Sequence, residues 1–253
     1  MSNDQAHAFL ALWNAITSES VQPEYEKWHS FEHVPERVGL PGFVQATRYR
    51  SVTQPLGYFT SYQLRSLDAL STPEYRDVFT NPTPWSARMR QVLCDFYRLP
   101  CQVGGVHGVG SASQLATLQW RSTTRPDLTE KINDLLHALV NNGRAIRGEW
   151  GYAPPTEEYW LPNTSSSNLQ GVGIEHVLLL QHWDADFLKS SVLSLVQFLE
   201  THASSLGHPE YFEQLTHVCQ DEMSNSLGTR RPPLTTLFNH YTGDLGHDFS
   251  TKT

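Results

Sequence analysis

Apolar and polar residues alternate along several short runs of the chain, and segments with apolar residues three and four positions apart lie between them. In the first hundred residues this pattern predicts a strand, a helix, two strands, a helical region and one more strand. The predicted strands are residues 9–16, 43–49, 58–65 and 95–103. The first helix begins at Pro23, and the helical region, residues 68–93, is interrupted by a breaker at residues 81–84.

The same order of elements returns in the second half with almost no shared sequence. Residues 104–113 hold four glycines and little charge, and we expect them to link the halves. The predicted strands are 114–121, 144–152, 176–183 and 234–241, the predicted helices are 127–140, 186–202 and about 210–222, and 153–173 is expected to be an ordered excursion or a mobile loop. The pattern therefore indicates two ferredoxin-like βαββαβ repeats, 1–106 and 107–245, followed by a tail at 246–253.

The first predicted helix has an unusual polar face. Aromatic, imidazole and carboxylate side chains recur on it at spacings of three and four, namely Tyr25, Trp28, His29, Glu32, His33 and Glu36. Pro35 is expected to weaken or end the helix just past His33. His33 would then lie at a helix C-terminus, where the helix dipole favours the imidazolium and raises the pKa of the ring.

The segment His33-Val34-Pro35, followed by a Pro41-Gly42 turn into the next strand, resembles the EthD-like branch of the dimeric α+β barrel superfamily. Residues 57–62 look like the third strand of that family and residues 81–85 like the start of its second helical region. In this superfamily two sheets meet through their apolar faces, usually between subunits. Two repeats in one chain meet at high effective concentration. The resemblance therefore implies an α+β fold in which two fused repeats with antiparallel sheets form an intrachain α+β barrel.

His33 is the preferred candidate for chemistry, as a general acid/base in a cavity between helix and sheet. His29, Glu32 or Glu36 would set the pKa and orientation of its ring. The resemblance supports this role, because characterised relatives include polyketide cyclases, lactone isomerases, decarboxylases and cofactor-free oxygenases, several of which use a histidine and a tyrosine. The alternative is structural, with the His-x-Pro histidine capping local backbone or pairing with a carboxylate.

Candidate substrate-binding residues are spread over both halves. Period-two alternation places Arg48 and Tyr49 on opposite faces of their strand, so one of them is a candidate to face the cavity. The full set of candidates is Trp13, Trp28, Arg48, Tyr49, Tyr62, Trp85, His182 and His240. An ordinary core position is the alternative for each aromatic residue. Arg37 and Arg88 are further candidates for holding a carboxylate, with a solvated surface charge as the alternative.

Residues 29–33 also match the H-x-x-E-H pattern of inverzincin metalloproteases. Pro35 follows closely and no third ligand stands out, which disfavours a protease. A two-histidine metal site completed by Glu32, Glu36 or a strand residue stays open. The chain has no glycine-rich nucleotide fingerprint and no G-x-S-x-G, and nothing distinguishes an axial haem ligand among its 12 histidines. We therefore expect no metal and no cofactor.

The overall charge restricts the class of partner. The 253 residues carry a formal net charge of −8, and no Lys/Arg cluster offers a footprint for nucleic acid or an anionic membrane. No apolar run approaches the ~20 residues of a membrane-spanning helix, and no signal-peptide pattern opens the sequence. Cys94, Cys101 and Cys219 lack metal or redox spacing. These features predict a cytoplasmic monomer or homodimer whose partner is a small-molecule substrate.

Together the sequence predicts a cofactor-independent lyase, isomerase or cyclase. It would act by histidine general acid/base catalysis on a small aromatic or polyketide-like enolisable substrate. Two alternatives remain open at this point. One is a non-catalytic ligand-binding or stress-associated protein, and the other is a metalloenzyme using His29 and His33.

Overall fold

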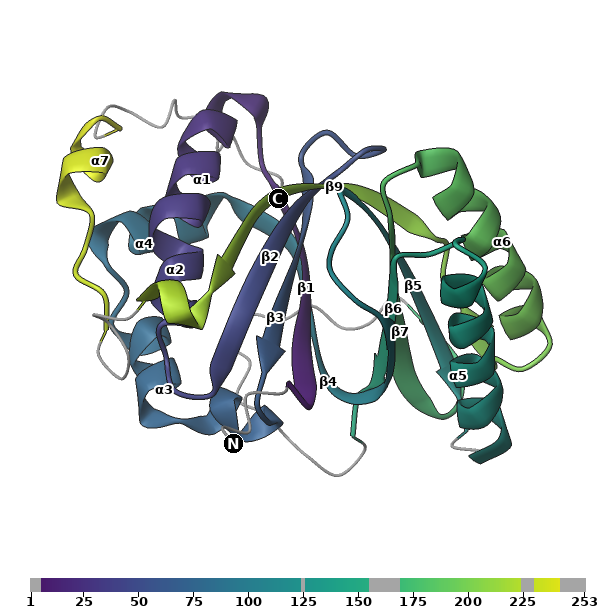
Figure 1. Cartoon of the computed structure of the whole chain (residues 1–253). Coiled ribbons are helices and arrows are strands. Elements are labelled where there is room, and N and C mark those ends of the chain that lie inside the picture. Colours follow the sequence, from purple (N-terminus) through teal and green to yellow (C-terminus); the bar gives the residue numbers. More distant parts are fainter. Residues whose placement is uncertain (1–5, 124–125, 155–168, 224–229, 242–253) are drawn as a thin grey trace.

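The structure is a computed structural model that describes residues 6–123, 126–154, 169–223 and 230–241. In this part of the chain, nine strands form one antiparallel sheet, and eight of them close into a barrel because β7 pairs with both β6 and β5. Helices cover the barrel on two opposite sides (Figure 1). The strands are β1 (Ala8–Ile16), β2 (Phe43–Ser51), β3 (Gly57–Leu64), β4 (Leu93–Gly108), β5 (Gln114–Ser122), β6 (Arg147–Tyr152), β7 (Ile174–His182), β8 (Ser205–Leu206) and β9 (Glu210–Cys219).

The barrel is built from two four-stranded sheets with the same strand order. The first repeat has the order β4-β1-β3-β2 and the second has β9-β5-β7-β6. The two sheets join where β2 pairs with β9 and where β4 pairs with β6. The predicted α+β fold, with two ferredoxin-like repeats closed into an intrachain barrel, is therefore confirmed.

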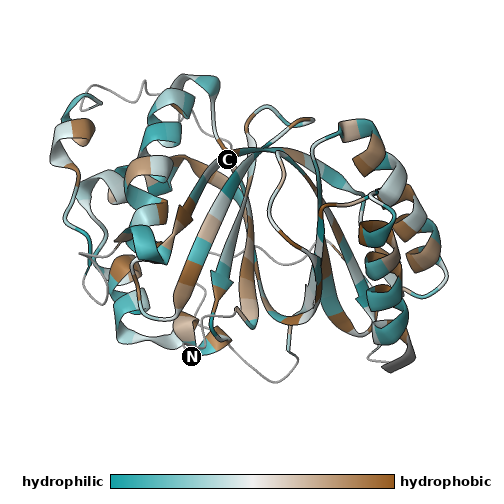
Figure 2. Ribbon diagram, in the orientation of Figure 1, coloured by the Kyte–Doolittle hydropathy of each residue, from teal (hydrophilic) through white to brown (hydrophobic). Residues whose placement is uncertain are grey.

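Helices on the outer faces give each sheet its own core. The first repeat carries α1 (Gln22–Trp28), α2 (Val34–Val38), α3 (Pro73–Thr80) and α4 (Pro84–Met89), and the second carries α5 (Pro126–Asn141) and α6 (Ala185–Glu200). The outward faces of α5 and α6 are largely hydrophilic, while apolar segments line the sheets (Figure 2). Within the barrel a third core forms from alternate strand residues, among them Phe9, Phe59, Leu179 and Phe212. This alternation leaves the other strand face to meet the helices.

Two elements of the second repeat differ from the prediction. Residues 210–219 form strand β9 instead of a helix, and residues 235–239 form the short helix α7 (Thr235–Asn239) instead of a strand. The apolar residues Phe212, Leu215 and Val218 have a helix-like spacing of three, which misled the assignment. Pairing decides the outcome, because β9 has β2 on one side and β5 on the other and completes the barrel.

The glycine-rich segment 104–113 is not a simple linker. Strand β4 continues to Gly108 and pairs with β6, so the proposed boundary at residues 106 and 107 lies inside a strand. A Cβ atom on Gly104 would lie 2.4 Å from Cζ2 of Trp150. The glycines therefore allow close packing against an indole ring rather than flexibility. Most of the 153–173 excursion and the 246–253 tail lie outside the described residues.

The helix that carries His33 does not end at Pro35. Residues His29–His33 form a π-helical turn between α1 and α2, and the N–H of Val34 donates to the carbonyl of His29. Pro35 follows as a residue of the first turn of α2, and its carbonyl accepts from the N–H of Gly39 at 3.1 Å. A proline needs no N–H partner, and the wider π turn accommodates its ring. His33 therefore lies within a continuous helical segment, and the predicted position at a helix C-terminus is wrong.

The C-terminal segment returns to the first repeat. Helix α7 lies beside α1 and α4 (Figure 1). The ring of Tyr241 stacks on Trp85 at 6.2 Å between centroids, and the N–H of Leu234 donates to Glu32 at 3.0 Å. This segment thus covers the helix layer that holds His33.

Candidate active site

A cavity of about 260 Å³ lies between α2, α3 and the first sheet. Strand residues form its floor and helix residues its roof, so it occupies the layer where a ferredoxin-like repeat packs helices on a sheet. Its lining is largely apolar but includes one imidazole and three guanidinium groups. The lining residues are Leu10, Leu12, His33, Arg37, Phe43, Tyr62, Tyr75, Phe79, Thr80, Arg90, Leu93, Phe96 and Arg98.

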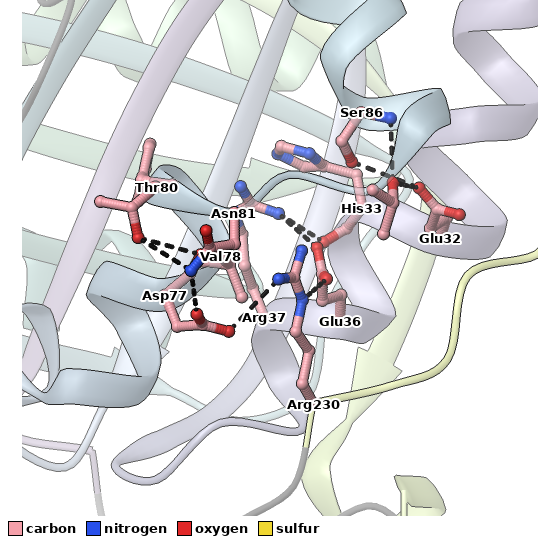
Figure 3. A network of polar contacts seen from close by, with 12 residues as sticks. Glu32, His33, Glu36, Arg37, Asp77, Val78, Thr80, Asn81, Ser86 and Arg230 are labelled. Carbon is pink, nitrogen blue, oxygen red and sulfur yellow. Dashed lines mark hydrogen bonds and ion pairs between the residues drawn. The ribbon is translucent and has the colours of Figure 1, made fainter.

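His33 is the imidazole of this cavity. Its ring points from the helix toward the sheet, on the other side of the helix from the Glu32 carboxylate (Figure 3). The Nδ1 atom is buried and has no hydrogen-bond partner among the described residues. Burial holds the pKa of His33 well below its usual range, and the nearby charges of Arg37 and the His29 ring lower this pKa further. The ring is therefore neutral, and the expected rise of its pKa is replaced by a fall.

Three arginines converge at one end of the cavity. The guanidinium carbons of Arg37, Arg90 and Arg98 lie 5.4, 5.4 and 5.2 Å from the ring centroid of Phe79. Burial lowers the pKa of Arg90 to about 10, which leaves it charged at neutral pH. Arg37, which was expected to be either a carboxylate ligand or a surface charge, is buried and lines the cavity.

Two tyrosines complete the polar lining. The Tyr62 hydroxyl is buried and has no hydrogen-bond partner within the described parts of the chain. Burial raises the pKa of Tyr62 above its usual value, so its hydroxyl is a donor at physiological pH. The hydroxyl of Tyr75 is hydrogen-bonded to Arg98, and burial raises the pKa of this phenol too.

Glu32 is turned away from the cavity and holds the helices together. Its carboxylate accepts from the hydroxyls of Thr83 and Ser86 at 2.5 and 3.2 Å, and from the N–H of Leu234. Thr83 is the N-cap of α4, and its hydroxyl accepts from the N–H of Ser86. Glu32 therefore joins α4 and the C-terminal segment to the helix of His33.

Glu36 binds arginines rather than His33. Its carboxylate accepts from Arg230 at 2.7 Å and lies 3.6 Å from Arg37, and Arg230 also reaches Asp77 at 3.2 Å (Figure 3). The Arg37 guanidinium donates in turn to the main-chain carbonyl of His33 at 3.1 Å. These contacts fix the helix turn that presents the imidazole.

His29 and Trp28 lie behind His33 as seen from the cavity lining. The ring centroids of His29 and His33 are 4.6 Å apart, and those of Trp28 and His33 are 4.3 Å apart. Burial holds the pKa of His29 well below its usual range. The Trp28 indole donates to Ser86 at 3.1 Å. Both residues buttress the His33 ring and neither lines the cavity.

Of the eight predicted substrate-binding residues, all of which the structure describes, Tyr62 alone lines the His33 cavity. Trp13 and Tyr49 lie inside the barrel, and Arg48 pairs with Glu26 at 3.2 Å. The other placements are these: Trp28 behind His33, Trp85 donating to Glu24 at 3.1 Å, His182 bonded to the N–H of Asp184 at 2.9 Å, and His240 at the end of α7. The structure thus brings His33 and Tyr62 together and disperses the others.

Arg90, Arg98, Tyr75 and Phe79 are cavity residues that the sequence analysis did not single out. One signal was present for Arg98, because a strand with period-two alternation places it on the helix-covered face, where charge is unusual. Its register partner is Leu12, which faces the same cavity. Arg90 gave no such signal, since it lies in a short 3₁₀ turn between α4 and β4.

The second repeat has a cavity of different character. It measures about 270 Å³ and lies under α5, and its described lining contains no charged side chain. His176 lies in its wall, 3.0 Å from the Ser122 hydroxyl, with its ring stacked on Trp120. The concentration of charge and unpaired polar atoms therefore favours the cavity of the first repeat as the active site.

Metal ligation and membrane insertion were also examined on the geometry. Within the described ranges, no three His, Cys, Asp or Glu side chains are placed so that they could share a metal ion. His29 and His33 are adjacent, but Glu32, the third member of the H-x-x-E-H pattern, is bound to Thr83 and Ser86. None of the helices in the described residues has the length and apolar character needed to cross a bilayer.

No protein-family model matches the sequence, and no curated protein shows significant similarity to it. Solved structures do match. An anthrone oxidase-like protein has a TM-score of 0.60 at 10% identity, covering 87% of this chain and 96% of its own. Proposed monooxygenases from Fusobacterium nucleatum and Lactobacillus acidophilus have TM-scores of 0.57 and 0.55 at 9% and 8% identity, each covering 85% of this chain and 95% and 97% of theirs. At these identities the likeness shows the fold alone, and that fold is the dimeric α+β barrel, closed here within one chain.

Proposed function

We propose that this chain is an enzyme that moves protons on a small, enolisable aromatic or polyketide-like substrate, with His33 as the acid/base and no cofactor. The observation that carries the proposal is a buried, neutral imidazole in the wall of a largely apolar cavity. A neutral imidazole is ready to accept a proton, whereas an imidazolium is not. The resemblance to the EthD-like branch, which includes cyclases, isomerases and decarboxylases, belongs to this proposal.

The neighbouring groups suit the formation of an enolate. His33 would take a proton from carbon next to a carbonyl, and the electron pair of that C–H bond would move onto the carbonyl oxygen. The hydroxyl of Tyr62 is a buried donor in the same wall, and the arginines supply a positive field. Return of the proton to another atom then completes an isomerisation or a cyclisation. Nδ1 of His33 is buried, so Nε2 is the atom that would carry the proton.

His29, Glu32 and Glu36 would act as positioning residues in this scheme. Glu32 and Glu36 fix the helix through Ser86, Thr83 and the two arginines described above. His29 packs on the His33 ring and is itself kept neutral by burial. They therefore limit the rotation of His33 without touching the substrate.

Exchange of substrate protons in D₂O tests the proposal before the product is known. Wild-type protein is incubated with aryl ketones and aryl β-diketones, and proton NMR follows loss of the signal of the acidic C–H. We expect exchange that falls by about 10²- to 10⁴-fold in His33→Asn, the typical contribution of a general base. The exposed His137→Gln serves as the matched control. Undiminished exchange in a folded His33→Asn protein would refute the role of His33.

A second candidate function is cofactor-free oxygenation of the same carbanion. The names of three structural neighbours, an anthrone oxidase-like protein and two proposed monooxygenases, favour it. In that case the enolate would give its electrons to O₂, so oxygen uptake would accompany turnover and would stop in His33→Asn. An oxygen electrode separates this reaction from the isomerase or cyclase, which consumes no O₂.

The remaining alternatives have separate tests. A non-catalytic ligand-binding protein would retain ligands in the cavity and show neither exchange nor oxygen uptake. A metalloenzyme using His29 and His33 would contain stoichiometric metal in elemental analysis, and the metal would be lost in His33→Ala. A cytoplasmic location and a monomeric or homodimeric state stay predictions, and native mass spectrometry measures the latter.

A further inference from the structure

The cavity beside His33 holds more positive charge than its described lining balances. Arg37, Arg90 and Arg98 line it, and no aspartate or glutamate occurs among the described lining residues. Arg37 and Arg98 are only 4% and 2% exposed. Water therefore solvates these two guanidinium groups poorly, and buried charge is costly unless an opposite charge lies close to it.

The nearest described carboxylate is already shared. One oxygen of Glu36 accepts from Arg230 at 2.7 Å, and the other lies 3.6 Å from Arg37. Arg230 has a second partner in Asp77, which lies toward the surface. Glu36 therefore neutralises at most part of the charge of Arg37, because Arg230 competes for it at a shorter distance.

The other two arginines are held by neutral groups. Arg90 donates to the main-chain carbonyls of Phe79 and Val78 at 2.8 and 2.7 Å. Arg98 is hydrogen-bonded to the hydroxyl of Tyr75. These bonds fix the two guanidinium groups in place without adding negative charge to the cavity.

The charge is also concentrated in one place. All three guanidinium groups lie within 5.4 Å of the Phe79 ring centroid. The rest of the lining consists mainly of aromatic and aliphatic side chains, with His33 on the helix side. A ligand that complements this cavity has an anionic end for the arginines and an apolar body for the remainder.

We propose that the substrate of this site is an aromatic carboxylate, whose carboxylate group lies among Arg37, Arg90 and Arg98 and whose ring extends toward His33. The inference deepens the proposed function, since it names the substrate class of the same cavity, but it concerns binding and not turnover. An enolate formed during reaction does not replace this permanent anion, because the buried charge is present before any proton moves.

Calorimetric titration with two matched probes tests the inference. 2-Naphthoate and 2-naphthamide share their shape, and they differ in charge. Charge-assisted hydrogen bonds add enough affinity that we expect naphthoate to bind about tenfold to a hundredfold more tightly than the amide. Equal binding of the two probes, or no binding of naphthoate at millimolar concentration, would overturn the inference.

Variants assign the preference to the arginines. Arg90 is half-buried, so Arg90→Gln is the replacement that disturbs the core least. We expect it to lower the affinity for naphthoate about tenfold and to leave the affinity for naphthamide unchanged. Arg50→Gln, an exposed residue of β2, is the matched control. A naphthoate preference that persists unchanged in a folded Arg90→Gln protein contradicts the proposed placement, and the wild-type comparison stands if that variant does not fold.

A third variant separates this inference from the proposed function. His33→Asn keeps all three arginines, so it should retain the preference for naphthoate while proton exchange is lost. A naphthoate preference without any exchange in the wild type would refute the proposed function alone. Exchange on neutral ketones without a naphthoate preference would refute the anion site alone.

Discussion

Arg230 bridges two carboxylates that differ in burial, and this arrangement permits a matched test of electrostatic stability. The Glu36 side chain is 1% exposed and that of Asp77 is 45% exposed. Their distances to the same guanidinium are 2.7 and 3.2 Å. We compare Glu36→Gln with Asp77→Asn, because each replacement removes one charge and nearly preserves shape.

The expected magnitudes follow from burial. Glu36→Gln leaves Arg37, itself buried, beside an uncharged amide, and removing one member of a buried pair costs about 3–5 kcal/mol. Asp77→Asn removes an exposed partner, which costs about 0–1 kcal/mol. For a chain of this length about 1 kcal/mol corresponds to roughly 2–4 °C in Tm. Glu36→Gln should therefore lower Tm by at least about 6 °C, and Asp77→Asn by no more than about 4 °C.

Urea denaturation followed by tryptophan fluorescence gives the free energies of unfolding, and thermal melting gives Tm. The double variant Glu36→Gln with Arg230→Gln measures how much of the loss comes from the Arg230 partner. If Glu36→Gln is no more destabilising than Asp77→Asn, the claim that Glu36 compensates buried arginine charge is refuted. The further inference would then lose its estimate of how much charge is left unbalanced.

Two further predictions concern the second repeat. Burial lowers the pKa of His176 to about 4 from the usual 6.5, so below pH 6.5 the unfolded chain binds a proton that the folded chain does not, and stability should fall by up to about 3 kcal/mol between pH 6.5 and 4. His176→Gln should remove this part of the slope in urea titrations at several pH values, whereas the exposed His137→Gln should keep it. Gly104→Ala should cost about 1–3 kcal/mol, because its Cβ would collide with the Trp150 indole. Ser111→Ala, an exposed residue of the same glycine-rich segment, should cost almost nothing, and equal stability of these two variants would restore the linker interpretation.

The sequence was most informative where a local pattern and the fold agree. Strand-like alternation located β1, β2, β3, β5 and β7, and helical periodicity located α5 and α6. His33 was identified from its His-x-Pro context, and it does line a cavity. These successes share a cause, because side-chain period and turn residues are properties of a short segment that tertiary contacts reinforce here.

Local pattern failed where partners distant in sequence decide the structure. Segment 210–219 has a helix-like spacing, but open edges on β2 and β5 make it a strand. Pro35 is tolerated because a π turn precedes it, and that turn keeps His33 inside the helix. The pKa of His33 was predicted to rise from the helix end, yet burial and Arg37 lower it.

The sequence by itself determined the repeated order of elements and the histidine that faces the cavity, because both follow from residues close together along the chain. Only the tertiary structure decided which groups surround that histidine. Arg37, Arg90 and Arg98 come from a helix, a 3₁₀ turn and a strand, and they meet at Phe79 only after the helices pack on the sheet. Burial and charge depend on that packing, so the electrostatics of the site arise from the assembled fold.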